Sequence, residues 1–219
     1  MSDDELISLY LGLILEANKT INLTRIESLD QARILHIEDS LSALPEINSA
    51  PQGLYGDLGT GGGFPGVPVA IKTGRNAILV DSVKKKAAVI EKAVSELSLS
   101  NQIKVYPGRI EDLTLEKKSS FAVLSARALS QLPSLLELSS PLLIKGGRLV
   151  CYKARLSDDE LNHAKSLEGA LGMKLASIRS FILSDGETHR TIVTFEKVSK
   201  AKIKLPRRVG LAQKSPLVV

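Results

Sequence analysis

DLGTGGGFPG, the stretch from Asp57 to Gly66, decides which fold this chain can adopt. Four of its glycines fall within five positions, between a short apolar run and a segment of helical pattern. Because glycine has no side chain, such a loop lets the backbone approach a ligand closely. Glycine loses more conformational entropy on folding than other residues, so this loop is costly to order, and packing alone gives no reason for that cost. We therefore expect a ligand to bind at this loop.

Apolar runs alternate with amphipathic segments around the loop, as in a doubly wound α/β sheet. Near-continuous apolar strands are typical of a parallel sheet that helices cover on both faces. The expected strands are 53–58, 77–81, 103–106, 121–125 and 148–153, and the expected helices are 66–72, 83–97, 130–143 and 158–171.

The last part of the sheet follows a different pattern. Two alternating runs, 173–183 and 188–196, are joined by Ser184-Asp185-Gly186-Glu187. An Asp-Gly step between such runs predicts a β-hairpin, so the last strand should run antiparallel to the others. Methyltransferase sheets typically end in this way, whereas dehydrogenase sheets usually continue parallel.

Two ligand classes fit the glycine loop to different degrees. Gly61, Gly63 and Gly66 match the G-x-G-x-x-G pattern of dinucleotide sites, and Asp81 matches the acid that binds a ribose there. Asp57, however, stands where a pyrophosphate would be repelled, and its carboxylate suits a cationic amino group. S-adenosylmethionine has such a group, a ribose and no phosphate. We expect this cofactor and an α/β, Rossmann-like class I methyltransferase fold with a parallel sheet and an antiparallel last strand.

The composition is that of a globular protein, with 43% hydrophobic and 24% charged residues among 219. A single cysteine, Cys151, excludes an internal disulfide framework and a thiolate metal cluster. No apolar run reaches the roughly 18 residues that cross a bilayer, and the acidic start of the chain is unlike a signal peptide. We expect a cytoplasmic protein, a monomer, with no metal and no membrane partner.

The net charge of +5 resides at the end of the chain. From Lys197 onward there are seven Lys and Arg residues and no acid, which leaves 22 basic and 24 acidic residues in the rest of the chain. Such a tail favours a polyanion such as RNA, although a solvated terminus without a partner is the alternative. The predicted RNA contacts are Lys202, Lys204, Arg207 and Arg208.

These patterns divide the chain into three parts: an N-terminal helical extension (1–50), a methyltransferase domain (51–198) and a basic C-terminal tail (199–219). The extension should contain a helix over 3–17 and a second from about 30 to 44, which Pro45 would end.

Seven strings occur in the order of a known family. They are Asn22-Leu23-Thr24, His36-Ile37-Glu38-Asp39-Ser40, DLGTGGGFPGVPVAI (57–71), LVDSVKKK (79–86), Gly108-Arg109-Ile110-Glu111-Asp112, Ser125-Ala126-Arg127-Ala128 and LPRRVGLAQKSPL (205–217). Together they resemble the RsmG (GidB) family from about residue 18 to the C-terminus. Members of that family are bacterial S-adenosylmethionine-dependent methyltransferases that act on N7 of one guanosine in 16S ribosomal RNA, so the resemblance implies 16S rRNA or the small ribosomal subunit as partner.

The resemblance also implies roles for individual residues. Gly59 and Phe64 should touch the cofactor, as should Gly61 from its place in the loop. Ile110 and Glu111 should lie beside the adenine. Two positions depart from the family pattern: Leu35 stands where an arginine is usual, and Ala154 where a glycine is usual.

Methylation at guanine N7 makes modest chemical demands. N7 carries a lone pair and no proton, so the enzyme needs alignment and a dry site rather than a general base. Arg127 follows a strand at the ligand-binding edge of the sheet. It should contact the cofactor carboxylate, guanine O6 or a phosphate, since a bond to N7 would occupy the attacking lone pair. An ion pair with a nearby acid is the alternative.

His36 shares a helical face with Asp39 and Ser40, and either packs at the domain junction or contacts the substrate. Phe64 and Tyr152 are the aromatic residues best placed to stack on the target base.

Other reactive or charged residues are expected to be structural. Cys151 should be buried in a strand, His163 and His189 should be surface residues, and Lys84–Lys86 should form a solvated helix face. Two other functions stay open at this point: a nicotinamide-dependent dehydrogenase and a catalytically silent ribosome-assembly factor.

Overall fold

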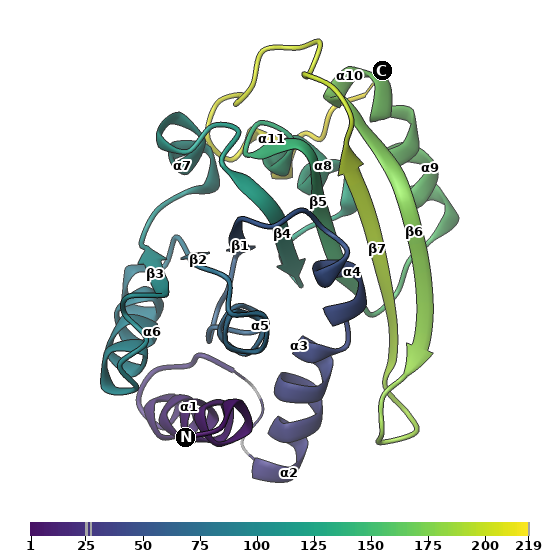
Figure 1. The fold of residues 1–219 in the computed structure, drawn as a ribbon. Coiled ribbons are helices and arrows are strands. Elements are labelled where there is room, and N and C mark those ends of the chain that lie inside the picture. The colour runs from purple at the N-terminus through teal and green to yellow at the C-terminus, as the bar shows by residue number, and fades with distance from the viewer. Residues whose placement is uncertain (25, 27, 219) are drawn as a thin grey trace.

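One seven-stranded sheet forms the centre of the computed structural model, which describes residues 1–24, 26 and 28–218 (Figure 1). The strand order is β3-β2-β1-β4-β5-β7-β6. The strands are β1 (Leu54–Leu58), β2 (Ala77–Val80), β3 (Ile103–Tyr106), β4 (Phe121–Arg127), β5 (Leu143–Lys153), β6 (Met173–Ile182) and β7 (His189–Lys197).

The strand directions confirm the predicted methyltransferase-like sheet. The first five strands pair in parallel, whereas β7 lies antiparallel between β5 and β6. The hairpin turn before β7 is held by Asp185, whose carboxylate accepts the backbone N–H groups of Glu187 and Thr188 at 3.0 and 2.8 Å. A turn this short can join only antiparallel strands.

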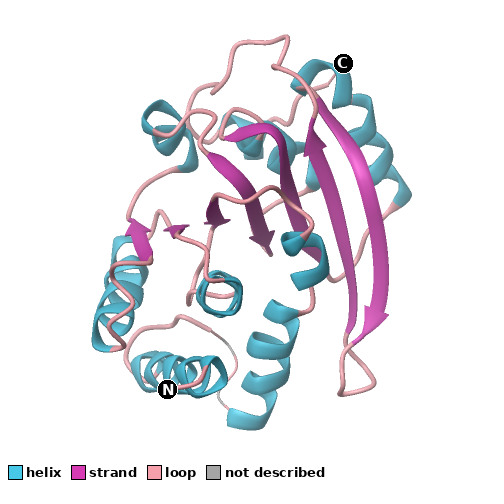
Figure 2. Ribbon diagram, viewed as in Figure 1, coloured by secondary structure: helices cyan, strands magenta, loops and turns pink. Residues whose placement is uncertain are grey.

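Helices cover both faces of the sheet (Figure 2). Those of the α/β part are α5 (Gly66–Thr73), α6 (Lys84–Glu96), α7 (Ile110–Glu116), α8 (Leu132–Ser139), α9 (Asp158–Ser166) and α10 (Glu168–Leu171). Along β5, Val150 packs into one core, while Leu149 and Cys151 pack into the other. This alternation is the two-residue period of a strand that is buried on both faces.

Helix α1 (Asp3–Asn18) packs against α5 and α6. It begins with a capping box, in which the Ser2 hydroxyl accepts the Glu5 N–H and the Glu5 carboxylate accepts the Ser2 N–H. The predicted helix over 3–17 is confirmed.

The second predicted helix, from about 30 to 44, is divided in the structure. It comprises α2 (Leu29–Ala32), a π-helical segment η1 (Arg33–Glu38) and α3 (Asp39–Leu41), and is followed by α4 (Leu44–Asn48). The prediction that Pro45 ends a helix is wrong, because Pro45 lies in the first turn of α4. Proline is tolerated there since the first N–H groups of a helix have no internal partner.

The C-terminal segment, residues 199–218, folds back onto the α/β part (Figure 1). Its short helix α11 (Leu211–Lys214) packs on α8, and Ala212 is buried. The imidazole Nε2 of His163 donates to the Leu217 carbonyl at 2.6 Å. The basic tail is thus docked on the body, rather than being the solvated terminus that was the alternative reading.

Within the part of the chain that the structure describes, no helix has both the length and the apolar character needed to span a membrane.

Candidate functional site

A cavity of about 380 Å³ lies at the carboxyl ends of the parallel strands. Loops that follow β1, β2, β3 and β4 contribute to its walls, which is where open α/β sheets bind ligands. The structure brings all seven predicted cofactor residues to this cavity: Gly59, Gly61, Phe64, Asp81, Ile110, Glu111 and Arg127.

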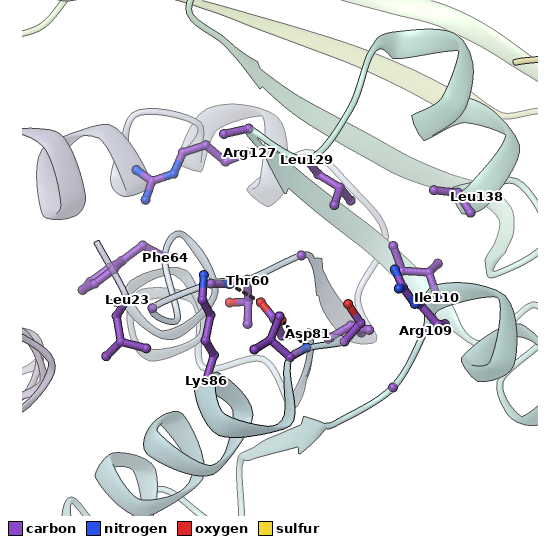
Figure 3. A pocket seen from close by; sticks show the side chains of 18 of the residues that line it. Leu23, Thr60, Phe64, Asp81, Lys86, Arg109, Ile110, Arg127, Leu129 and Leu138 are labelled. Carbon is purple, nitrogen blue, oxygen red and sulfur yellow. Dashed lines mark hydrogen bonds between the residues drawn. The ribbon is translucent and has the colours of Figure 1, made fainter. Parts of the chain in front are cut away.

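The labelled lining residues gather at two ends of the cavity (Figure 3). Phe64, Leu23 and Arg127 lie at one end, and Ile110, Leu138 and Arg109 lie at the other. Asp81 lies between them, so an elongated ligand would meet its carboxylate midway and the apolar side chains of Ile110 and Leu138 at the far end.

The glycine loop requires glycine at two positions for different reasons. Gly61 has φ +61°, and a Cβ added there would meet no atom within 4 Å, so this backbone borders open space. Gly63 has φ +84°, and a Cβ there would collide with the Tyr10 hydroxyl of α1. The first glycine leaves room for a ligand, and the second leaves room for the helix that supports the loop.

Asp57 does not face the cavity, so the prediction that its carboxylate meets a cationic ligand is wrong. It is fully buried and accepts the Gly66 N–H at 3.0 Å and the Ser125 hydroxyl at 2.6 Å. Burial raises the pKa of this carboxyl, against the opposing effect of its hydrogen bonds. Asp57 lies near the end of β1, and its bond to the Gly66 N–H ties this strand to the start of α5.

Asp81 does line the cavity, and it also organises the backbone around it. One carboxylate oxygen accepts the Gly61 N–H at 2.9 Å, and the other accepts the Val83 N–H at 2.8 Å. Asp81 thereby joins the loop after β1 to the loop after β2.

His36 lies in η1 and is only 6% exposed. Its ring is stacked on Phe64, and its Nε2 is 2.9 Å from the Thr24 hydroxyl. Burial, followed by the positive charge of Arg127, lowers the pKa of His36 to about 4. The imidazole is therefore neutral at neutral pH, and it packs against the cofactor loop while lining the cavity.

A second cavity, of about 490 Å³, adjoins the first and shares His36, Arg127 and Ala128 with it. Its other lining residues are Ile26, Leu35, Asp39, Tyr152, Lys153, Ala154, Arg155 and Arg190. Four of the lining side chains are Lys or Arg: Arg127 and Arg190 pair with Asp39, and Lys153 pairs with Glu160 at 2.7 Å. Four cations against these two acids leave an excess of positive charge, which suits an anionic ligand. Both positions that depart from the family pattern, Leu35 and Ala154, also lie in its wall.

Arg127 joins the two cavities and is held by the N-terminal extension. Its guanidinium donates to the Leu35 carbonyl at 2.9 Å and to the Asp39 carboxylate at 2.8 Å. Asp39, 1% exposed, also accepts two bonds from Arg190 at 2.7 and 3.1 Å. Arg127 therefore forms an ion pair with a nearby acid and still presents its side chain to both cavities.

The four predicted RNA contacts differ in their surroundings. Lys202, Lys204 and Arg208 are exposed. Arg207 instead makes two 2.6 Å bonds to the buried carboxylate of Glu137 on α8. Arg207 thus docks the C-terminal segment, whereas the other three side chains are accessible to RNA.

Several lining residues were not predicted from the sequence. Lys86, expected on a solvated helix face, borders the cofactor-sized cavity, as do Leu129, Leu138 and Gln213. Tyr10, which lies below the glycine loop, donates its hydroxyl to the Gly62 carbonyl at 3.0 Å. Of these five residues, Lys86 and Gln213 stand within strings that resemble the family. A matching string does not show which of its side chains face a ligand.

The described residues contain no cluster of three or more His, Cys, Asp or Glu side chains placed to hold a metal ion. Cys151 is buried as predicted, and burial raises the pKa of its thiol to about 12. Such a thiol is a poor nucleophile at neutral pH.

Comparison with known proteins identifies the family. The model of the GidB family, "rRNA small subunit methyltransferase G", matches residues 3–193. Proteins named ribosomal RNA small subunit methyltransferase G are similar over nearly the whole chain. The one from Pseudothermotoga lettingae is 35% identical and covers 99% of this chain and 92% of its own. Those from Carboxydothermus hydrogenoformans and Bacillus subtilis are each 33% identical and cover 97% of this chain, and 91% and 90% of their own.

Solved structures support the fold. A geranyl diphosphate methyltransferase in complex with GPP and sinefungin has a TM-score of 0.60 at 14% identity, and covers 74% of this chain and 78% of its own. The geranyl diphosphate C-methyltransferase of Streptomyces coelicolor has a TM-score of 0.58 at 14% identity, and covers 73% of this chain and 79% of its own. The fold is that of class I methyltransferases, and a nicotinamide-dependent dehydrogenase is no longer a competing reading. The chain belongs to the family of rRNA small subunit methyltransferase G, with S-adenosylmethionine as its methyl donor.

Proposed function

We propose that this protein methylates N7 of a single guanine in 16S ribosomal RNA, at the family's guanine-527 position. The observation that carries the proposal is the junction of two cavities at Arg127, one suited to the cofactor and one lined by cations. A methyl donor in the first cavity and a nucleotide in the second would meet beside His36, Arg127 and Ala128.

The first cavity fits S-adenosylmethionine. The open space beside Gly61 admits a ligand close to the backbone, and the carboxylate of Asp81 suits the hydroxyls of a ribose. The side chains of Ile110 and Leu138 offer an apolar surface to a flat purine. Gly59 and Phe64 would contact the middle and the methionine part, with Glu111 beside the purine.

The residues of the second cavity suit a methyl acceptor that does not have to be deprotonated by a general base. S-adenosylmethionine supplies an electrophilic methyl group on a sulfonium when it is bound. Guanine N7 attacks with its own lone pair, the sulfur–carbon bond breaks, and no proton has to leave the base. Of the described residues that line the second cavity, His36 is a weak base, because its pKa is lowered to about 4. The carboxylate of Asp39, in the same wall, is held by two arginines.

Arg127 is a positioning residue in this proposal. Its bonds to Asp39 and the Leu35 carbonyl fix the guanidinium, and the remaining donors can face guanine O6 or a phosphate. The expectation that Phe64 or Tyr152 stacks on the target base is not supported, because both rings are packed in the core, at 4% and 3% exposure. Phe64 is covered by the ring of His36, and the hydroxyl of Tyr152 donates to the Ser40 carbonyl at 2.7 Å. The target base would still have to be single-stranded or flipped out to reach the methyl group.

The division into a helical extension, a methyltransferase domain and a basic tail is part of the same proposal. The exposed cations Lys202, Lys204 and Arg208 of the tail would contact RNA phosphates. The extension would orient Arg127 and support the glycine loop.

The test is methyl transfer to small-subunit ribosomal RNA from cells that lack this protein, offered both as naked RNA and as assembled subunits. Labelled methyl should appear at one guanine and at N7. A short RNA with 7-deazaguanosine at that position is the matched control, because carbon replaces N7 and the base otherwise keeps its pairing edge. Methyl incorporation into the control, or mapping to another atom, would overturn the N7 assignment. No incorporation into either form of RNA would favour a silent assembly factor.

A further inference from the structure

The C-terminal segment contributes a side chain to the cofactor cavity. Gln213, from α11, lines this cavity together with residues that lie more than 70 positions earlier in the chain. Helix α11 packs on α8, which carries Leu138 at the end of the cavity where Ile110 also lies (Figure 3).

Two buried carboxylates hold the segment in this place. The Gly210 N–H donates to Glu111 at 2.7 Å, and Glu111 itself lines the cavity. Arg207 makes two bonds to Glu137, one residue before the lining residue Leu138. Gln213 is therefore three residues beyond one anchor and six beyond the other, on a helix whose Ala212 is buried.

The position of Gln213 relative to the second cavity determines which part of the cofactor it would meet. The methyl group must face the acceptor, so the methionine part of the cofactor belongs at the end where His36, Arg127 and Ala128 are shared between the cavities. The opposite end, with Ile110 and Leu138 (Figure 3), is left for the purine.

We propose that Gln213 recognises the adenine of the cofactor, and that the docked C-terminal segment is a wall of the cofactor site as well as a carrier of cations. A glutamine amide presents one donor and one acceptor side by side, and these complement the N6 amine and N7 of adenine. The proposal rests on cofactor binding in the first cavity, and does not depend on guanine N7 as the methyl acceptor.

The test measures binding of two probes by calorimetry: S-adenosylhomocysteine, and its inosine analogue, in which a carbonyl replaces the N6 amine. Wild-type protein should prefer the adenosine compound. Gln213→Ala should raise the Kd for S-adenosylhomocysteine roughly five- to tenfold, the equivalent of one or two hydrogen bonds, and should lose most of the preference. Lys214→Ala is the matched control, because Lys214 is exposed on the same helix and does not line the cavity.

A double-mutant cycle tests the anchoring. Arg207→Gln should weaken S-adenosylhomocysteine binding by releasing the segment, and adding Gln213→Ala to it should have little further effect, because the two residues act through one contact. An unchanged Kd and an unchanged preference in Gln213→Ala would overturn the proposal and leave the methyltransferase function intact. Failure of the wild-type protein to bind S-adenosylhomocysteine would overturn the cavity assignment, and this proposal with it.

Discussion

The ring of His36 lies flat against the ring of Phe64, with centroids 4.6 Å apart and planes 4° from parallel. Phe64 belongs to the glycine loop, whereas His36 belongs to the N-terminal extension. Tyr10 of α1 meets the other side of the same loop, edge-on to Phe64 at 5.6 Å and bonded to the Gly62 carbonyl. Two elements of the extension therefore support the glycine loop, and substitutions of His36 or Tyr10 should affect cofactor binding.

Tyr10→Phe should show this support directly. The substitution keeps the ring and leaves the buried Gly62 carbonyl without its donor, which costs about 1 kcal/mol of stability. We expect the Kd for S-adenosylmethionine, measured by calorimetry, to rise roughly two- to fivefold. This rise corresponds to a loss of at most about 1 kcal/mol of binding free energy. Tyr152→Phe is the control, because it removes a buried hydroxyl bond to the Ser40 carbonyl outside the glycine loop. Equal cofactor affinities in the two variants would contradict the supporting role of α1.

The lowered pKa of His36 predicts a pH dependence of stability. The folded protein holds this imidazole neutral down to about pH 4, whereas the unfolded chain takes up a proton near pH 6.5. Between these values the unfolded state binds more protons, so the free energy of unfolding should rise with pH and reach its full value above about 6.5. The contribution is on the order of 3 kcal/mol.

Many carboxyl groups also titrate near the lower end of this pH range, so the effect of His36 has to be measured as the difference in stability between two proteins. Chemical denaturation of wild-type protein and of His36→Gln should be compared from pH 4 to pH 7. The wild-type protein should gain stability over the variant as the pH rises. Parallel curves would mean that folding does not lower the pKa of His36.

Gly61→Val should abolish cofactor binding in a folded protein. The new side chain would enter the open space of the cavity, and the positive φ adds strain of about 1–2 kcal/mol. Gly74→Val carries a comparable strain, at φ +64° and with no atom near its Cβ, but lies outside the cavity. Both variants should unfold at lower denaturant concentration. Only Gly61→Val should raise the Kd for S-adenosylmethionine, by roughly 100-fold or more; normal affinity would show that the ligand lies elsewhere.

Asp39→Asn should separate cofactor binding from methyl transfer. Arg127 and Arg190 would lose the buried charge that holds them, at a cost on the order of 3 kcal/mol in stability. Methyl transfer should fall at least about tenfold because Arg127 loses its orientation, while the Kd for S-adenosylmethionine changes little. Glu46→Gln, which weakens the ion pair with Arg179 away from both cavities, should keep the activity. A fully active Asp39→Asn variant would show that methyl transfer does not depend on the orientation of Arg127.

Local sequence patterns predicted the sheet and the position of the glycine loop at the cavity, because those features depend on short-range rules. The apolar runs predicted the strands, the Asp-Gly step predicted the hairpin, and the glycines predicted the loop that borders the cavity. The failures concern contacts between distant segments. Asp57 is turned into the core by Ser125 and the Gly66 N–H, and no local pattern distinguishes that from a carboxylate facing a ligand.

The docking of the tail shows the same limit. Charge alone described residues 199–219 as a basic arm, whereas Glu137 pairs with Arg207 across 70 positions of sequence, and Glu111 with Gly210 across 99. Which of the two adjacent arginines, Arg207 or Arg208, has a carboxylate partner can be identified only when the packing of α8 and α11 is known. Gln213 was missed for this reason, since its access to the cavity depends on both anchors.

The exposed cations of the C-terminal segment give the last prediction, which concerns salt. Lys202, Lys204 and Arg208 should each neutralise one phosphate of single-stranded RNA, so replacing all three by Gln should weaken binding. It should also lower the slope of log K against log salt concentration by about 2, since each contact contributes about 0.7. Substitution is preferred to truncation, because removing the segment would also remove Arg207 and Gln213 from the body. Filter binding to a fragment of 16S RNA at several salt concentrations measures the slope.

The matched control replaces three exposed lysines by Gln: Lys19, which directly follows α1, Lys92 on α6 and Lys104 on β3. It changes the net charge of the protein by the same amount, so any general electrostatic attraction is reduced equally. Only the tail variant should lose slope by the amount that phosphate contacts predict, and its Kd for S-adenosylmethionine should stay at the wild-type value because Arg207 and Gln213 are intact. Equal slopes in the two variants would mean that the tail attracts RNA only through net charge, and a wild-type slope in the tail variant would mean that these cations do not contact RNA.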